Sequence, residues 1–527
     1  MTDKPIIIMN ENSKREIGRD AQRNNIMAAK IVAETIKTTL GPKGMDKMLV
    51  DSVGNITVSN DGVTILEEIE IEHPAAKMVV DIAKTQDKEV GDGTTSAVMI
   101  AGKLLENAES LLDKKIHPTV ITRGYRLAAE KSQELIKNIS INIESNDSLL
   151  KELVYTSLAS KNASAKKEKF AAIIVKAVKQ ISDVGINLDN IKIEKIKGDG
   201  IEDTELIEGI VLDKERASLD MPVKIENAKI ALIESALEII KPETETRISI
   251  SSPEQLDNFI QHQETVLKAM VEKIKESGAN VVFCQKGIDE MAQYYLAKEK
   301  VYACRRVAKS DIEKLARATG AKIISNINEL SLEQLGYAAS VEQVSDGETY
   351  TYIRGCKNPK ALTILIRGGT EHVIAEIERA LKDGMGVVAS AIKDKKILPG
   401  AGAIEIELAK RLRDFANSLG GREQLAVEEF ASALEFIPIT LAENAGLDPI
   451  DILTELRARH GKGEINAGIN LLAGKIEDSI QAGIIEPIKI KQQAIASATE
   501  VAIMILRIDD VIAAGNKKAR QTMPEIE

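Results

Sequence analysis

Apolar and polar residues alternate mainly with a helical period over the first 150 positions. Apolar residues recur every three or four positions up to Leu40, and the predicted helix ends at Gly41-Pro42 because proline cannot continue a helix. Around Gly54-Asn55 the pattern shortens to the alternation typical of strands. The elements predicted for this mostly helical region are a helix over 15–40, strands within 47–58, and helices over 94–115 and 119–140.

The middle of the chain alternates short β-type runs with helical ones. Ser252 is a good N-cap, Pro253 suits the first helical position and Gln255 completes a capping box, so a helix is predicted from there to Gly278. The two isoleucines of 248–250 alternate with polar residues, as in a strand. This alternation indicates an α/β domain. The other predicted elements are strands within 207–213, 227–234, 279–285, 301–307, 321–325 and 361–369, and helices over 287–300 and 309–319.

The pattern becomes helical again from position 371 onward. Helices are predicted over 404–420, 422–443 and 491–513. Two helical ends therefore bracket an α/β middle. The length of 527 residues suggests about three domains at roughly 150 residues each.

The composition of the chain limits the kinds of molecule that it is expected to bind. The net charge is −11, the pI is about 5.4, aromatic residues make up 3% and tryptophan is absent. An acidic chain with few aromatic rings repels phosphate backbones and stacks bases poorly, so we expect no nucleic-acid partner. Three widely spaced cysteines are no disulfide framework, and the five histidines lack the spacing of a zinc site. No apolar run approaches about 20 residues and no signal-peptide pattern is present, so we expect a cytoplasmic protein without a membrane span.

The sharpest chemical feature is a glycine-rich loop over 91–96, GDGTTS, directly before an apolar helix. Glycines let a ligand approach the backbone closely, and free N–H groups at a helix N-terminus attract phosphate. The three hydroxyls can add hydrogen bonds, and Asp92 can hold a Mg²⁺ ion that binds phosphate. An ordinary capped loop would have the same spacing. The chain has neither a Walker A loop nor a GxGxxG motif, so a nucleotide site here would be of another type.

Three further glycine loops lie elsewhere in the chain, over 39–44, 60–64 and 399–403. Each is also compatible with a structural turn, because Asp-Gly and Gly-Pro pairs are common in turns. The spacing of the loops does not show whether they converge on one site.

Several long motifs together resemble group II chaperonins, above all the archaeal thermosome subunits, and more distantly the eukaryotic cytosolic chaperonin. The resemblance covers nearly the whole chain. The motifs are TLGPKGMDKML (39–49), NDGVTIL (60–66), GDGTTSAVMIAG (91–102), the segments 280–324 and 355–370, GGREQLAVEEFASALEFIPITLAENAGLDPIDIL (420–453) and ATEVAIMILRIDDVIAA (498–514).

The resemblance implies a multidomain fold, α and α/β, in three parts. A helical equatorial ATP-binding domain would combine 1–147 and 402–527. A small intermediate hinge domain would combine 148–216 and 367–401, and an α/β apical substrate-binding domain would occupy 217–366. Within the apical domain, about 243–277 matches the helical protrusion that serves this family as a built-in lid.

The resemblance also implies a site for ATP and Mg²⁺. Asp383, in ERALKDG, matches the aspartate that orients or deprotonates the attacking water, and Asp61 would lie beside the γ-phosphate. Lys161, in TSLASK, matches a lysine that senses the γ-phosphate, and Glu486 would lie near the ribose. The implied nucleotide-binding residues are Leu40, Gly41, Pro42, Asp92, Gly93, Thr94, Thr95, Ser96, Lys161, Gly400, Gly402 and Glu486, with Asp92 also the Mg²⁺ ligand.

The implied function is that of an ATPase that drives protein folding. Subunits, identical or paralogous, would assemble into a double ring and enclose non-native polypeptides while ATP is bound and hydrolysed. Two departures from the family pattern keep an alternative open. The family usually has three glycines where this chain has Gly400-Ala401-Gly402, and Lys382 stands where a second acid often precedes the catalytic one. The alternatives are a structural paralogue with weak or no ATPase activity and a stand-alone Mg²⁺-dependent phosphotransferase.

Overall fold

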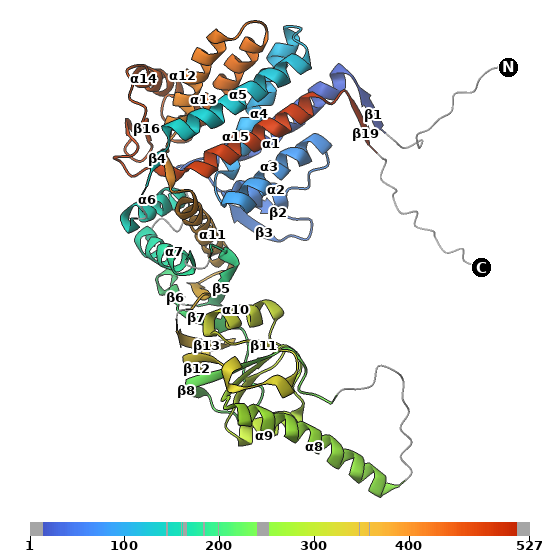
Figure 1. Ribbon diagram of the computed structural model, residues 1–527. Helices are drawn as coiled ribbons and strands as arrows, with labels where there is room; N and C mark the ends of the chain where they lie inside the picture. The colour runs from blue at the N-terminus through green and yellow to red at the C-terminus, as the bar shows by residue number, and fades with distance from the viewer. Residues whose placement is uncertain are drawn as a thin grey trace, which may run out of the picture. The chain divides into compact units, whose positions relative to one another are not determined.

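The computed structural model describes residues 14–143, 146–159, 161, 166–182, 185–198, 200–239, 252–346, 348–357 and 359–513. The chain divides into two compact units, Met1–Lys167 with Lys382–Glu527, and Glu168–Leu381. The first is mostly helical and the second combines helices with a large sheet, as the sequence pattern predicts (Figure 1). The boundaries of the three expected domains stay a prediction.

Helix α4 is the centre of the first unit. It packs against α1, α3, α13 and α15, and its side chains are buried on nearly all sides (Figure 1). A helix that is apolar all round is stable only inside a core, which explains its place. The helices of this unit are α1 (Arg19–Lys37), α2 (Gly62–Glu68), α3 (Pro74–Val90), α4 (Thr94–Asp113), α5 (Pro118–Ile139), α6 (Asp147–Leu158), α12 (Ala403–Ser418), α13 (Glu423–Asn444), α14 (Pro449–Gly461) and α15 (Ile488–Leu506).

Small antiparallel sheets join distant segments of the first unit. The strands are β1 (Lys14–Ile17) with β19 (Asp510–Ala513), β2 (Lys47–Val50) with β3 (Ile56–Ser59), β15 (Lys396–Pro399) between β4 (Ile141–Asn142) and β18 (Ile485–Pro487), and β16 (Ala467–Asn470) with β17 (Lys475–Asp478). The strands predicted within 47–58 are confirmed, and they pair as a hairpin whose second strand ends at Ser59. The predicted helices over 15–40 and 491–513 are wrong at their outer ends, because both ends of the described chain pair as strands β1 and β19. Such long-range pairing overrides the local pattern.

A buried histidine ties α12, α14 and β16 together. His460 is fully buried, its Nδ1 lies 2.8 Å from Glu407 Oε2, and its Nε2 lies 2.9 Å from the carbonyl oxygen of Ala467. Arg411 donates to the other oxygen of Glu407 at 2.7 Å, and Lys410 donates to the carbonyl oxygen of His460. Because both ring nitrogens face acceptors, the network fixes the start of β16, a strand that reaches the cavity described below.

The second unit contains a mixed sheet in the order β10-β9-β8-β12-β13-β7, with β11 also on β8. The pairs β8–β9, β9–β10 and β8–β11 are parallel. The pairs β8–β12, β12–β13 and β13–β7 are antiparallel. The strands are β7 (Gly209–Leu212), β8 (Lys224–Ile233), β9 (Val281–Cys284), β10 (Tyr302–Cys304), β11 (Ile323–Ile324), β12 (Gly336–Asp346) and β13 (Glu348–Cys356), and the helices between them are α9 (Glu290–Lys298) and α10 (Lys309–Thr319). The predicted α/β alternation is confirmed, whereas the long β12–β13 hairpin was not predicted.

A smaller sheet in this unit places β14 (Leu362–Gly368) between β5 (Ile191–Lys197) and β6 (Glu205–Ile207), and α7 (Lys167–Ser182) precedes it in the chain. Helix α11 (Glu371–Asp394) follows it and contributes its last residues, from Lys382 on, to the first unit. Asp383 therefore belongs to the same unit as the glycine loops.

Helix α8 (Pro253–Ser277) matches the helix predicted within the expected lid protrusion. The Ser252 hydroxyl oxygen accepts the N–H of Gln255, and Gly278 ends the helix with a positive φ of 81°. Residues 243–251 of the expected protrusion, including the predicted strand at 248–250, lie outside the described residues.

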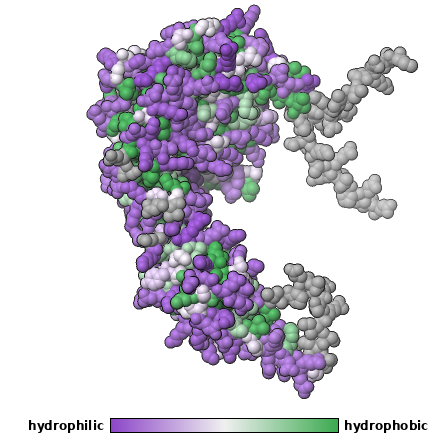
Figure 2. Space-filling model, viewed as in Figure 1, coloured by the Kyte–Doolittle hydropathy of each residue, from purple (hydrophilic) through white to green (hydrophobic). Residues whose placement is uncertain are grey.

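Hydrophilic residues cover most of the face shown in Figure 2. Several large apolar side chains are nevertheless exposed on the β2–β3 hairpin of the first unit, among them Met48, Val50 and Val53. Within the part of the chain that the structure describes, no helix is both long enough and apolar enough to cross a membrane.

We predict that His460→Phe lowers the free energy of unfolding by about 2–4 kcal/mol, because it removes two buried hydrogen bonds and one of the two partners of Glu407. Urea unfolding followed by circular dichroism measures this change. His262→Phe, at an exposed position of α8, is the control and should unfold like the wild type. Equal unfolding midpoints for the two variants would contradict the role given to His460.

Candidate active site

A cavity of about 740 Å³ in the first unit gathers nearly all the residues that the resemblance assigns to the nucleotide. Its size suits a ligand of nucleotide dimensions. Gly400 lies just outside the lining, where its N–H donates to the Ile484 carbonyl oxygen and a Cβ would lie 3.1 Å from Glu486 Oε1. The expected residues that line the cavity are Leu40, Gly41, Pro42, Asp61, Asp92, Gly93, Thr94, Thr95, Ser96, Lys161, Asp383, Gly402 and Glu486.

The segment over 91–96, here called the phosphate loop, comprises the turn between α3 and α4 and the first three residues of α4, on the wall of this cavity. Gly91 ends α3 and Gly93 precedes α4, with φ values of 77° and 79°, a conformation that favours glycine. Gly93 is the N-cap and has no side chain with which to satisfy the first N–H groups of α4. The loop is therefore not an ordinary side-chain-capped one, and it offers backbone donors and three hydroxyls to an anion.

The second glycine loop packs directly on the phosphate loop. Asp61 is the N-cap of α2, and its Oδ2 accepts from Thr64 N at 3.0 Å and Thr64 Oγ1 at 2.8 Å. Its Oδ1 lies 3.4 Å from Thr94 Oγ1. A Cβ at Gly62 would lie 2.8 Å from Thr95 Oγ1, so a side chain there would force the two loops apart. Asp61 thus has a capping role beside the one implied by the resemblance.

One glycine lets α11 lie close against the end of α3. A Cβ at Gly386 would lie 2.5 Å from the Val90 carbonyl oxygen, whereas one at Gly91 would make an ordinary contact, 3.7 Å from the Cα of Asp383. This close approach sets Asp383 beside the phosphate loop. Sequence reasoning missed Gly386, whose only signal is that it is a glycine inside a helical pattern, three residues after Asp383.

Asp383 and Lys161 form an ion pair in which Nζ of the lysine donates to Oδ2 of the aspartate. Their side chains are only 13% and 8% exposed. Burial raises the pKa of Asp383 to about 8, although the Lys161 ammonium opposes the rise. Burial also disfavours the ammonium of Lys161, but the carboxylates of Asp383, Asp92 and Asp61 outweigh it and raise the lysine pKa. Three interacting carboxylates thus surround the ammonium of Lys161 in this part of the site.

A second buried ion network supports another part of the cavity wall. Lys491 Nζ lies 2.7 Å from Glu405 Oε1 and 2.9 Å from Glu486 Oε2. Burial raises the pKa of Glu486, and Lys491 opposes this effect. Sequence reasoning missed Lys491 and Glu405. Each could have been found as a charged residue on the buried face of a helix. Such residues are rare unless the charge is paired.

The remaining glycine positions shape the other walls. Gly41 and Gly402 have φ values of 84° and 81°, and a Cβ would lie 2.5 Å from Leu441 Cδ2 at the first and 2.7 Å from Pro438 Cβ at the second. Ala401 lines the cavity with a φ of 58°, which is unfavourable for a residue with a Cβ. Its carbonyl oxygen accepts from the backbone N–H of residue 469 at 3.0 Å. The methyl group is accommodated at the expense of backbone strain.

The donor set fits a magnesium nucleotide better than a permanent metal centre. Among the described residues, no group of three or more His, Cys, Asp or Glu could hold a metal ion. Asp92 lies on the cavity wall and its Oδ1 already accepts from Gly93 N at 2.6 Å, which leaves its other oxygen for a cation. Mg²⁺ typically takes one or two carboxylates and completes its shell with phosphate oxygens and water.

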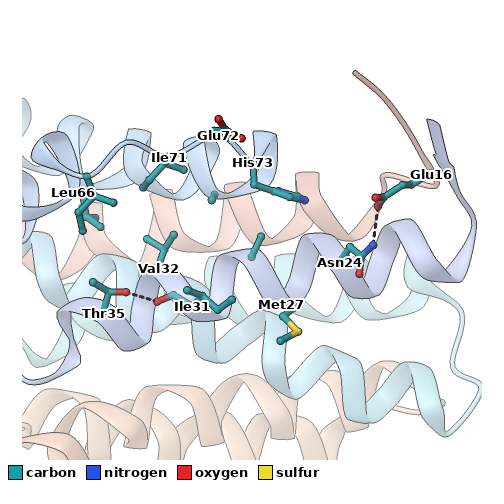
Figure 3. Close-up of a pocket in the computed structure, with 13 residues that line it drawn as sticks. Glu16, Asn24, Met27, Ile31, Val32, Thr35, Leu66, Ile71, Glu72 and His73 are labelled. Carbon is teal, nitrogen blue, oxygen red and sulfur yellow. Dashed lines mark hydrogen bonds between the residues drawn. The ribbon is translucent and has the colours of Figure 1, made fainter. Parts of the chain in front are cut away.

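A second cavity, of about 410 Å³, lies between α1 and the segment that joins α2 to α3 (Figure 3). Most of its lining is apolar, with Met27, Ile31 and Val32 on the α1 side. Its polar groups serve local structure: Asn24 donates to Glu16 at 2.8 Å, and His73 caps α3. It offers no cluster of donors for phosphate, so the larger cavity is the candidate active site.

We predict that Ala401→Gly stabilises the protein by about 0.5–1 kcal/mol. The change relieves the strain of a Cβ at positive φ, and the greater freedom of glycine in the unfolded chain offsets part of the gain. Thermal unfolding measures the effect. Ala403→Gly, in the first turn of α12, is the matched control and should destabilise by a similar amount. A lower melting temperature for Ala401→Gly would show that the methyl group contributes packing that outweighs the strain.

Comparison with known proteins identifies the family of this chain. The family model described as TCP-1/cpn60 chaperonin matches residues 32–516. The chain is 57% identical to thermosome subunit beta of Archaeoglobus fulgidus, over 97% of this chain and 95% of the relative. It is 56% identical to a thermosome subunit of Methanopyrus kandleri and 54% identical to thermosome subunit alpha of A. fulgidus, each over 97% of this chain and 95% of the relative. The chain therefore belongs to the TCP-1/cpn60 chaperonin family, in its group II branch, and is a chaperone subunit.

Proposed function

We propose that this subunit hydrolyses Mg-ATP and uses the cycle to enclose and fold non-native polypeptides. The observation that carries the proposal is one cavity in which the uncapped N-terminus of α4 and the nearly buried carboxylate of Asp383 meet. Phosphoryl transfer needs positioning and charge neutralisation more than covalent help, and these groups supply both. Mg²⁺, when bound, neutralises phosphate charge.

We assign the following roles in ATP binding and hydrolysis to residues of the chain. The N–H groups of Thr94, Thr95 and Ser96 bind phosphate oxygens, and Asp92 holds the cation. Asp383 orients the attacking water and accepts its proton. Lys161, which is paired with Asp383, can turn its ammonium toward the γ-phosphate. Glu486 would contact the ribose.

We also propose that the subunit assembles with identical or paralogous chains into a double ring. The relatives carry the names thermosome subunit alpha and beta, which indicates paralogous chains in that group. The exposed apolar residues Met48, Val50 and Val53 on the β2–β3 hairpin are well suited to burial between subunits. The proposed setting is the cytoplasm, where the three free and buried cysteines would remain reduced.

The experiment that tests the proposal is Mg²⁺-dependent ATP hydrolysis by wild type and Asp383→Asn. We expect kcat to fall by about 10²–10⁴-fold in the variant with little change in ATP affinity, because the base is lost and the shape is kept. Asp394→Asn, on the same helix but outside the lining, is the control. A wild type that binds ATP without turnover would instead favour the structural paralogue, and unchanged kcat in Asp383→Asn would remove its catalytic role.

The pH dependence of kcat/KM gives a second prediction, because kcat/KM reports the pKa values of the free enzyme. A general base acts in its ionised form, and burial raises the pKa of Asp383 to about 8, so kcat/KM should rise with pH up to that region and then level off. Lys161→Met removes the charge that opposes the rise in pKa and should move the rising limb to higher pH. A kcat/KM that is flat from about pH 6 to about pH 9 in the wild type would contradict Asp383 as the base.

A further inference from the structure

Gln86 is a fully buried polar residue of α3 that lies directly behind the phosphate loop. Its Nε2 donates to the carbonyl oxygen of Asp92 at 2.8 Å and to that of Ile490 at 3.2 Å. The first acceptor belongs to the phosphate loop and the second to the first turn of α15, whose residues Ile490 and Lys491 line the cavity. One amide group therefore joins two walls of the candidate active site.

The contacts fix the orientation of the amide. Both neighbouring acceptors are carbonyl oxygens, so the NH₂ group must face them, and the flipped amide would set Oε1 against two oxygens. The Oε1 of Gln86 is then buried without a hydrogen-bond partner among the described residues. A buried acceptor without a partner lowers stability, and this cost offsets part of what the two hydrogen bonds of Nε2 contribute.

The hydrogen bond to Asp92 determines where its side chain lies. In a planar trans peptide the C=O of residue 92 and the N–H of residue 93 point in opposite directions. Because Gln86 holds the Asp92 carbonyl oxygen on its own side, the N–H of Gly93 faces away from Gln86, and this N–H donates to Asp92 Oδ1 at 2.6 Å. The carboxylate is thereby held on the side of the loop opposite Gln86.

The same amide and Ile490 confine Gly93 between them. A Cβ at Gly93 would lie 2.8 Å from Ile490 Cγ2 and 3.1 Å from Gln86 Nε2. A shift of the loop toward α3 or toward α15 would therefore bring it into a steric clash. Helices α3, α4 and α15 lie side by side around this point (Figure 1).

We propose that Gln86 is a positioning residue for the metal-nucleotide complex: its amide fixes the Asp92–Gly93 peptide against α15 and so aims the Asp92 carboxylate at the cation of a bound magnesium nucleotide. The inference rests on the proposed nucleotide site and adds a residue that touches neither nucleotide nor metal. Residues that orient a metal ligand typically alter metal affinity or activity by about 10–100-fold when replaced.

The chain provides a matched control in Gln133. Its Nε2 donates to the Gln492 carbonyl oxygen at 2.9 Å, so it also ties a neighbouring helix to α15, and it lies outside the lining of the cavity. Gln86→Met and Gln133→Met each keep the side-chain length and remove the donor. Comparing them separates the loss of a helix–helix hydrogen bond from the loss of loop position.

The readout is calorimetric binding of a non-hydrolysable ATP analogue to the full-length protein at a series of Mg²⁺ concentrations. We expect the half-saturating Mg²⁺ concentration to rise about 10-fold or more in Gln86→Met, and to stay within about twofold of the wild type in Gln133→Met. Binding of the analogue in the absence of Mg²⁺ should change little in either variant, because the N–H groups of α4 remain.

The variant Gln86→Glu allows a second, independent test, which does not depend on how well Gln86→Met folds. A protonated carboxyl group can donate one hydrogen bond to the Asp92 carbonyl oxygen, whereas the ionised form is repelled by both carbonyl oxygens. Mg²⁺-dependent binding by Gln86→Glu should therefore recover several-fold as the pH is lowered from about 8 to about 6. Gln133→Glu should show no such recovery beyond that of the wild type.

The outcomes distinguish this inference from the proposed function. If the wild type binds the analogue and both Gln86 variants keep its Mg²⁺ dependence, the positioning role is overturned and the proposed function stands. If the wild type binds the analogue with Mg²⁺ but does not hydrolyse ATP, the proposed function fails and the binding comparison still decides the role of Gln86. If the wild type does not bind the analogue at all, both are overturned.

Discussion

The burial of α4 is the constraint on which the rest of the first unit depends. Its sequence is apolar on nearly every side, so the helix can be stable only at the centre of the core. Its first turn nevertheless carries N–H groups that no intrahelical acceptor satisfies, and the N-cap is a glycine. A core helix with unsatisfied donors at one end needs a polar cavity there, and the candidate active site occupies that position.

Close backbone approach shapes this cavity and collects charge in it. At Gly62, Gly386 and Gly402 a Cβ would lie within 3 Å of a neighbouring atom, so only glycine lets these segments meet as they do. The approach brings several carboxylates around Lys161, while Lys491 pairs with two glutamates elsewhere along the wall. Carboxylates in a poorly solvated cavity repel one another unless cations compensate them, which suits a site that takes up its ligand together with a divalent cation.

The sequence by itself determined the features that depend on neighbours along the chain. The helical period predicted α4 and α5, the Ser252 cap predicted the start of α8, and the alternation of the middle predicted an α/β unit. Each glycine loop was visible as a candidate, and resemblance of long motifs supplied the family and the expected role of Asp383. These predictions succeed because capping and periodicity are local properties.

The tertiary structure alone decided what depends on contacts between distant segments. It paired β1 with β19, although each end had been predicted as helix, because strand pairing joins residues without regard to their separation in sequence. It also brought the phosphate loop, Lys161, Asp383, Glu486 and Lys491 to one cavity, and it placed Gln86 behind the phosphate loop. No local pattern reveals such neighbours, because their partners lie far away along the chain and meet only when the core has packed.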